Sequence, residues 1–231
     1  MSHEQSVIRE PDAFSTRFWA AAALVIILAL AFAPAQAAAK SLKIVMLGDS
    51  LTAGYGLPPS QALPVRLQTA LKQNGYDAEI INAGVSGDTT AGGLARLDWS
   101  VPDDADGVIV ELGANDALRG LPAANARKNL DAILTRLGQR KIPVLLTGML
   151  APLNMGETYR AEFAAIFPDL SRKHRVPLYP FFLDGVAANA ELNQADGKHP
   201  NGKGVDVLVQ RLTPVVGKWL NAVKRTQAGS G

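Results

Sequence analysis

A serine stands at a turn where open α/β folds bind their ligands. Ser50 follows a short apolar run, residues 42–47, whose composition is typical of a buried parallel strand. Gly48 and Asp49 predict a sharp turn after this run, and the carboxyl ends of parallel strands are where such folds place functional groups. Ser50 is therefore a candidate nucleophile. The alternative is a turn in which Asp49 and Ser50 only cap the next helix.

A serine hydroxyl needs a base to take its proton, and histidine is the usual one. The chain has three histidines, of which His3 falls in a predicted signal peptide. His174 ends a predicted helix and precedes a strand, which puts it at the amino end of the sheet, opposite the site. His199 lies three residues after Asp196, so one tight turn lets the carboxylate accept the Nδ1–H of His199. The alternative is an Asp-Gly turn with His199 at the start of a helix, but elimination among the histidines favours His199.

An acyl-transfer site also needs donors for a developing oxyanion. Asn115 lies in Gly113-Ala114-Asn115-Asp116, directly after a predicted strand, and its amide can donate from the strand end. The alternative is an Asx turn that caps the next segment. Gly84 and Gly87 follow another strand, and a glycine there lets a backbone N–H approach a substrate closely. The N–H of Ser50 could complete the set.

The elements that must position these residues alternate between strand-like and helix-like stretches. Strands are predicted at 42–47, 78–82, 107–112, 143–147 and 176–179, and helices at 63–74, 89–97, from Pro122 onward, 157–173 and 205–223. Asp88 is expected to cap the second helix, and Pro168 and Pro214 to disturb or kink the last two. This alternation predicts one α/β domain whose parallel sheet is covered on both faces. The candidate groups then share one edge of the sheet.

The first 37 residues have the pattern of a secretory signal peptide. Arg9 and Arg17 precede an apolar run, residues 18–32, and small residues follow it. Cleavage is expected after Ala37, with Ala39 as the second choice. An uncleaved membrane anchor is the alternative, although the apolar run is short for a full span. The pattern predicts bacterial export to the periplasm or beyond.

Composition and charge exclude several classes of protein. The net charge of the 231 residues is +2, and it becomes +3 without residues 1–37, which hold two basic and three acidic residues. That charge is too small for a nucleic-acid surface, and no cluster of Lys and Arg stands out. The absence of cysteine excludes disulfides, thiolate metal sites and a cysteine nucleophile. Residues 38–225 are long enough for one domain, and 226–231 are expected to be a disordered tail.

Four short blocks resemble, in chain order, those of the GDSL or SGNH hydrolases. They are Gly48-Asp49-Ser50-Leu51, Ser86-Gly87-Asp88-Thr89, Gly113-Ala114-Asn115-Asp116 and Asp196-Gly197-Lys198-His199-Pro200. The chain is most similar to the exported bacterial arylesterase, thioesterase and lysophospholipase branch. The resemblance implies a flavodoxin-like α/β/α sandwich of three layers with about five parallel strands, and no metal or organic cofactor.

The same resemblance implies a role for each residue of the candidate site. Ser50 is the nucleophile, His199 the base and Asp196 the acid that orients it. Ser50, Gly87 and Asn115 supply the oxyanion donors. The choice of Gly87 over Gly84 rests on the match to the Ser-Gly-Asp-Thr block.

The implied activity is hydrolysis of aryl or short-to-medium acyl esters, extending to thioesters and lysophospholipids, through an acyl-enzyme. Loops after the strands are expected to supply the acyl-binding side chains Leu51, Leu118, Leu150, Pro152 and Phe182. The expected partner is a small-molecule substrate, with no stable membrane span after signal cleavage. Two alternatives are a carbohydrate O-deacetylase and a non-catalytic lipid- or glycan-binding protein, the latter disfavoured because no expected catalytic position is missing.

Overall fold

Five short strands form one fully parallel sheet in the computed structural model, which describes residues 41–228. The strands are β1 (Leu42–Gly48), β2 (Ala78–Gly84), β3 (Gly107–Glu111), β4 (Val144–Thr147) and β5 (Leu178–Tyr179), in the spatial order β2-β1-β3-β4-β5. Gly48 lies in register with Gly84 on one side and with Glu111 on the other. The carboxyl ends of β1, β2 and β3 therefore lie side by side at one edge of the sheet, which is where the sequence predicts the candidate residues.

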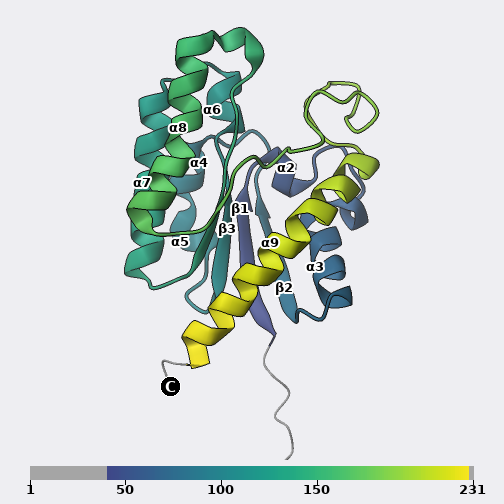
Figure 1. Cartoon of the computed structure of the whole chain (residues 1–231), viewed down its shortest axis with the longest axis vertical. Coiled ribbons are helices and arrows are strands. Elements are labelled where there is room, and N and C mark those ends of the chain that lie inside the picture. Colours follow the sequence, from purple (N-terminus) through teal and green to yellow (C-terminus); the bar gives the residue numbers. More distant parts are fainter. Residues whose placement is uncertain (1–40, 229–231) are drawn as a thin grey trace, which may run out of the picture. The chain divides into compact units, whose positions relative to one another are not determined.

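Helices cover both faces of this sheet (Figure 1). One layer contains α3 (Leu63–Gln73) and α9 (Gly202–Ala228), and the other contains α4 (Thr90–Ala95), α5 (Leu97–Ser100), α7 (Ala123–Gln139) and α8 (Glu157–His174). Short helical turns lie after the strands: α2 (Ser50–Ala53), η1 (Pro59–Gln61), α6 (Ala114–Leu118) and η2 (Leu153–Met155). The α/β sandwich predicted from the alternation of elements is confirmed. None of the helices within residues 41–228 has the length and apolar character needed to cross a membrane.

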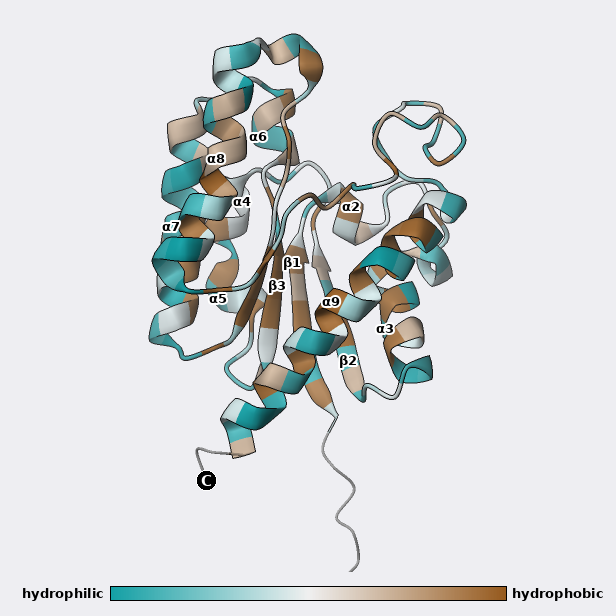
Figure 2. Cartoon of the chain, in the orientation of Figure 1, coloured by the Kyte–Doolittle hydropathy of each residue, from teal (hydrophilic) through white to brown (hydrophobic). Residues whose placement is uncertain are grey.

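The core lies between the sheet and the inner faces of the helices. Residues 44–47 of β1 are completely buried, because a central parallel strand is covered on both sides. Figure 2 shows the apolar residues running along β1 and β3. The longer helices bury stripes at helical spacing: Leu130, Ile133, Leu134 and Leu137 on α7, and Val205, Leu208, Leu212, Val216 and Leu220 on α9.

The helix predicted over residues 89–97 differs from the one observed. Thr89, not Asp88, is the N-cap of α4, and its side chain accepts a hydrogen bond from the Gly92 N–H. The helix is interrupted at Arg96, which separates α4 from α5. Asp88 forms an ion pair with Arg96 instead, at 2.6 Å. The Asp88 carboxylate, predicted to cap the helix, therefore pairs with the buried Arg96 instead.

The end of the chain also differs from its prediction. α9 runs to Ala228, so residues 226–228 of the predicted tail belong to the helix, and 229–231 lie outside the described residues. Both α8 and α9 continue through their prolines, Pro168 and Pro214. The predicted signal peptide, with the alternative sites after Ala37 and Ala39, also lies outside the described residues.

Candidate active site

The chain turns from β1 into α2 at Gly48, where any side chain would collide. A Cβ at Gly48 would lie 2.1 Å from Thr52 Oγ1 and 2.6 Å from Glu111 Oε2. Asp49 then caps α2, because its Oδ1 accepts a hydrogen bond from the Leu51 N–H at 3.0 Å. Ser50 is the first residue of α2 and its hydroxyl is left for another partner. Asp49 therefore caps the helix, while the hydroxyl of the adjacent Ser50 remains available. The two hypotheses for this segment, a helix cap and a nucleophile, are compatible.

Ser50, His199 and Asp196 form a continuous hydrogen-bonded chain. His199 Nε2 lies 2.9 Å from Ser50 Oγ, and His199 Nδ1 lies 2.6 Å from Asp196 Oδ2. The hydrogen bond from His199 is the main reason that the pKa of Asp196 falls to about 2. The ionised carboxylate favours the tautomer with hydrogen on Nδ1 and leaves the Nε2 lone pair facing the hydroxyl. This arrangement can take a proton from Ser50.

The turn that carries His199 is fixed on several sides. Asp196 Oδ1 accepts hydrogen bonds from the backbone N–H groups of Lys198 (2.9 Å) and His199 (3.1 Å). The Tyr55 ring packs on the imidazole, with centroids 4.7 Å apart and planes tilted by 39°. Gln194 donates through Nε2 to the carbonyls of Tyr55 and Pro200. Tyr55 and Gln194 escaped the sequence analysis because neither lies in a motif.

His174 lies elsewhere. It ends α8, before β5, and its Nε2 lies 2.6 Å from Asp131 Oδ1 of α7. Hydrogen bonds from Lys173 and then His174 lower the pKa of Asp131. His174 therefore has a carboxylate partner but no hydroxyl, and of the two histidines within residues 41–228 the structure brings only His199 to Ser50.

The two candidate glycines after β2 have different surroundings. The Gly84 N–H donates to Asn82 Oδ1 at 2.9 Å, and a Cβ at Gly84 would lie 2.3 Å from the Ala53 nitrogen. Gly84 is thus needed for the close packing of α2 on β2. Gly87 has a φ of +85°, and its N–H, like that of Ser50, has no acceptor among residues 41–228. Of the two glycines, Gly87 has the backbone donor available for a ligand.

Asn115 lies on the wall of the cavity next to Ser50. Its Nδ2 donates to the Asp88 carbonyl at 2.8 Å and, over a longer 3.2 Å, to Asp49 Oδ2. The neighbouring Asp116 is buried and accepts hydrogen bonds from the N–H and hydroxyl of Thr90, at 2.8 and 2.7 Å. These contacts join the loops after β2 and β3, so the amide of Asn115 is held in place from both.

Two buried acids lie beneath the turn that carries Ser50. Burial raises the pKa of Asp49 to about 6, and burial followed by the charge of Asp49 raises that of Glu111 well above its ordinary value. Glu111 Oε2 accepts from Thr52 Oγ1 (2.8 Å) and the Asp49 N–H (3.3 Å), whereas Oε1 has no partner among the described residues. Burial and the neighbouring Asp49 carboxylate thus both favour the neutral form of Glu111. A glutamate at the end of the apolar run 107–112 is the one sequence signal that marks it.

Arg96 fastens the loop after β2 to the same turn. The side chain is almost fully buried, and its guanidinium donates to the Gly48 carbonyl (2.8 Å), the Ala83 carbonyl (2.9 Å) and Asp88 Oδ2 (2.6 Å). The sequence gives no signal for this role, since an arginine in a helical stretch ordinarily lies on the surface.

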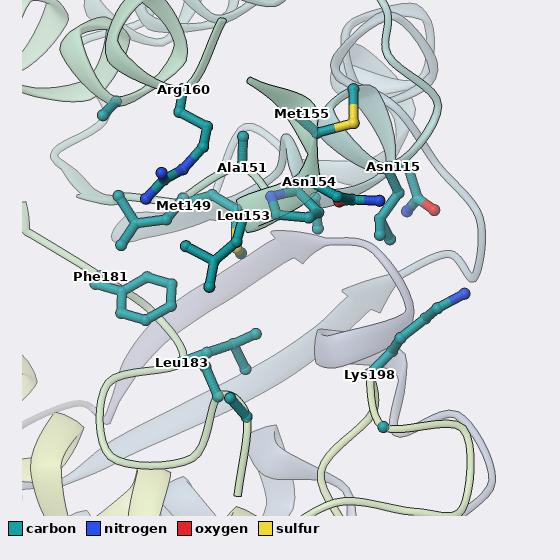
Figure 3. A pocket seen from close by; sticks show the side chains of 18 of the residues that line it. Asn115, Met149, Ala151, Leu153, Asn154, Met155, Arg160, Phe181, Leu183 and Lys198 are labelled. Atoms are coloured by element: carbon teal, nitrogen blue, oxygen red, sulfur yellow. The ribbon is translucent and has the colours of Figure 1, made fainter. Parts of the chain in front are cut away.

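A cavity of about 1170 Å³ opens beside Ser50 and His199. Four of the five predicted acyl-binding side chains line it: Leu51, Leu118, Leu150 and Pro152. The prediction for Phe182 is wrong, since its side chain is completely buried and its N–H donates to the Gly148 carbonyl at 2.8 Å. The neighbouring Phe181 lines the cavity (Figure 3). Phe182 begins the turn that follows β5, and no periodic pattern in the sequence distinguishes the buried phenylalanine from the one that lines the cavity.

Within residues 41–228, no group of three or more His, Asp or Glu side chains is arranged to hold a metal ion. The polar groups around the cavity are instead a hydroxyl, an imidazole, an amide and backbone N–H donors. These are the components of a site that can attack a carbonyl carbon and stabilise the negative charge on its oxygen.

Comparison with known proteins finds the same family from sequence and from structure. Residues 46–207 match the model of the GDSL-like Lipase/Acylhydrolase family. Esterase TesA of Pseudomonas aeruginosa is 38% identical over 190 residues, which cover 82% of this chain and 94% of the relative. Thioesterase 1/protease 1/lysophospholipase L1 of Escherichia coli K12 is 36% identical, covering 75% of this chain and 84% of the relative. The crystal structure of AlinE4, an SGNH-hydrolase family esterase, is 50% identical with a TM-score of 0.66, covering 78% of this chain and 96% of that one.

Proposed function

Because the chain belongs to the GDSL-like lipase/acylhydrolase family, we propose that it is a serine esterase that hydrolyses carboxylic esters through an acyl-enzyme on Ser50. The observation that carries this proposal is the chain of contacts from Ser50 Oγ through His199 to Asp196, with distances of 2.9 and 2.6 Å. A serine hydroxyl in such a chain can be deprotonated as it attacks.

The reaction follows from these contacts in two stages. Ser50 Oγ bonds to the ester carbonyl carbon while His199 Nε2 takes the hydroxyl proton, and Asp196 stabilises the imidazolium. The carbon–oxygen bond to the leaving group then breaks, and Nε2 returns the proton to the departing oxygen. Water attacks the acyl-enzyme with His199 again as the base, which releases the acid and restores Ser50.

Three donors are proposed to bind the oxyanion of each tetrahedral intermediate. The N–H groups of Ser50 and Gly87 have no acceptor among the described residues and are ready to donate. One N–H of Asn115 Nδ2 donates to Asp49 over a longer distance, 3.2 Å, and can donate to the oxyanion instead. The other N–H keeps its hydrogen bond to the Asp88 carbonyl. An amide held by a short hydrogen bond on one side is already oriented when the negative charge develops.

The cavity supports an acyl substrate. Apolar side chains from α2, α6 and the loop after β4 line it beside Ser50, including Leu51, Leu118 and Leu150. We propose aryl and short-to-medium acyl esters as substrates. Thioesters and lysophospholipids, which the name of the Escherichia coli relative mentions, react by the same steps and are proposed as further substrates.

We also propose that the chain is exported from a bacterial cell and that residues 1–37 are removed. The support is the order of Arg9 and Arg17, the apolar run 18–32 and the small residues that follow. Amino-terminal sequencing of protein recovered from the periplasm or medium tests this, with Ala38 or Lys40 expected as the first residue. An intact amino terminus in the membrane fraction would contradict it.

The experiment for the activity is a panel of p-nitrophenyl esters from acetate to palmitate, beside an acyl-CoA and a lysophospholipid. Ser50→Ala and His199→Ala should each lower kcat by about 10⁴ or more without unfolding the protein. His174→Ala is the matched control, because His174 also faces a carboxylate at 2.6 Å but no serine. Full activity in Ser50→Ala, or equal losses in the two histidine variants, would refute the assignment.

A further inference from the structure

Two cationic side chains line the cavity, Lys198 beside His199 and Arg160 on α8, and neither makes an ion pair with a residue between 41 and 228. Arg160 lies on α8, is half-buried and lines the cavity. Its guanidinium makes no hydrogen bond or ion pair with any residue the structure describes, whereas Arg172 on the same helix pairs with Asp169. Glu157, one turn earlier, also lines the cavity but does not pair with Arg160. A half-buried guanidinium without an acceptor is ready to bind an anion that enters the cavity.

Apolar surface lies between this cation and the reactive serine. Met149, Leu153, Phe181 and Leu183, from the loops after β4 and β5, line the cavity. In Figure 3, Arg160 and Phe181 lie on one side of the cavity, and Asn115 and Lys198 lie on the other. Apart from Asn154, the residues labelled between these two sides are apolar, and each side has one cation: Arg160 on one and Lys198, next to His199, on the other.

The chemistry of the reaction assigns the two sides to the two parts of an ester. His199 must return a proton to the leaving oxygen, so the leaving group lies on the side of His199 and its neighbour Lys198. The acyl chain then occupies the part of the cavity that extends away from His199. Arg160 lines the cavity on the side away from Asn115 and Lys198 (Figure 3), which is the side that the far end of the acyl chain would enter.

We propose that Arg160 binds a carboxylate at the far end of the acyl chain, so that the preferred substrates are half-esters of dicarboxylic acids. This rests on the proposed esterase function and names its substrate class. The guanidinium presents two parallel N–H groups to a carboxylate, and the apolar middle of the cavity covers the intervening methylene groups. A single guanidinium balances a monoanion such as a carboxylate better than a phosphate, which carries nearly two charges at neutral pH.

The test compares mono-p-nitrophenyl suberate with p-nitrophenyl octanoate, which have equal chain length and the same leaving group. The readout is the ratio of their kcat/KM values at pH 7.5 in the full-length enzyme. Arg160→Met, which keeps an apolar stem, should lower this ratio by about 10- to 100-fold, mainly through KM, because a charge-assisted hydrogen bond is lost. Arg172→Met removes the same charge from the same helix and should leave the ratio unchanged.

Further variants keep the proposal testable if Arg160→Met does not fold. Arg160→Lys should retain part of the preference for the suberate, since it keeps the charge without the two parallel donors. Arg160→Glu should reverse the preference for the suberate over the octanoate. It should also favour the p-nitrophenyl ester of 8-aminooctanoate, whose far end is a cation, over that of octanoate. An unchanged order of substrates in Arg160→Glu contradicts the proposal.

Two outcomes separate this inference from the function on which it rests. If the wild type hydrolyses the octanoate ester through Ser50 but the ratio is the same in Arg160→Met, the esterase stands and the substrate class is wrong. The substrate class is also wrong if Arg160→Met affects only an ester with its carboxylate on the leaving group, such as 4-carboxyphenyl octanoate. If Ser50→Ala keeps full activity, the esterase assignment itself fails.

Discussion

Replacing Asp196 by asparagine should be more harmful than replacing it by alanine. Asp196 Oδ1 accepts two backbone N–H groups, from Lys198 and His199, and Oδ2 accepts His199 Nδ1. In Asp196→Asn, the amide oxygen must stay with the two backbone donors, because an NH₂ group cannot accept from them. The NH₂ group then faces Nδ1 and donates to it, which places the imidazole hydrogen on Nε2. That tautomer cannot take the proton of Ser50.

The size of the effect follows from the two interactions that change. Loss of the carboxylate removes a charge-assisted hydrogen bond to the imidazolium, worth about 1.5–3 kcal/mol. For His199 to return to the reactive tautomer, the hydrogen bond from the new NH₂ group to Nδ1 must break. The NH₂ group then faces the Nδ1–H, so two donors oppose each other, which costs about 1–3 kcal/mol more. The sum corresponds to a decrease in kcat of about 10²–10⁴, at about 1.36 kcal/mol per factor of ten. Asp196→Ala loses the charge-assisted hydrogen bond and the two backbone contacts of Oδ1, but it has no NH₂ group to hold the unreactive tautomer, so its decrease in kcat should be about 10–10².

Steady-state kinetics with p-nitrophenyl butyrate at pH 7.5 measures both variants, and ¹⁵N NMR of the imidazole reports the tautomer. We expect hydrogen on Nδ1 of His199 in the wild type and on Nε2 in Asp196→Asn. Equal activity of the two variants, or an asparagine variant within threefold of the wild type, would show that the Asp196 carboxylate does not select the tautomer of His199. Another group would then have to orient His199.

Three further predictions concern the donors and the buried groups. Asn115→Ala should lower kcat for p-nitrophenyl acetate by about 10²–10³ with little change in KM, through loss of one oxyanion donor; equal losses in kcat and binding would contradict this role. Burial, and then the charge of Asp49, raise the pKa of Glu111. At pH values above the ordinary pKa of a glutamate, the folded state therefore binds more protons than the unfolded state, and the free energy of unfolding falls as pH rises. Glu111→Gln should therefore gain stability relative to the wild type between pH 5.5 and 8.5, measured by urea unfolding, and parallel pH profiles would show that Glu111 is ionised in the fold. Arg96→Met should lower the free energy of unfolding by about 3–5 kcal/mol, because Asp88 loses its buried partner; a urea midpoint close to that of the wild type would contradict this.

The sequence predicted the order of elements and the residues that meet at the sheet edge. Alternating apolar and amphipathic runs are local signals, and parallel strands bring their carboxyl ends together whatever their order in the chain. Ser50 and Asn115 could therefore be placed on one edge before the structure was known. His199 was found by elimination, since the chain has only three histidines.

The supporting contacts could not be predicted in this way because they join residues far apart in the chain. Arg96 reaches the Gly48 carbonyl across 48 positions, and Glu111 reaches Thr52 across 59. Neither pairing leaves a periodic or local pattern. The exchange of Phe182 for Phe181 has a different cause: β5 has only two residues, too few to set the phase of the segment after it.

Covalent labelling of Ser50 tests most directly whether this serine carries the acyl group. A p-nitrophenyl alkylphosphonate should react once per chain, and peptide mass spectrometry should locate the phosphonyl group on Ser50 Oγ. Esterase activity should fall in proportion to the labelled fraction, and Ser50→Ala should take up no label while it keeps its thermal unfolding midpoint. Loss of activity with the label on another residue, or full activity in fully labelled protein, would contradict the claim that Ser50 carries the acyl group.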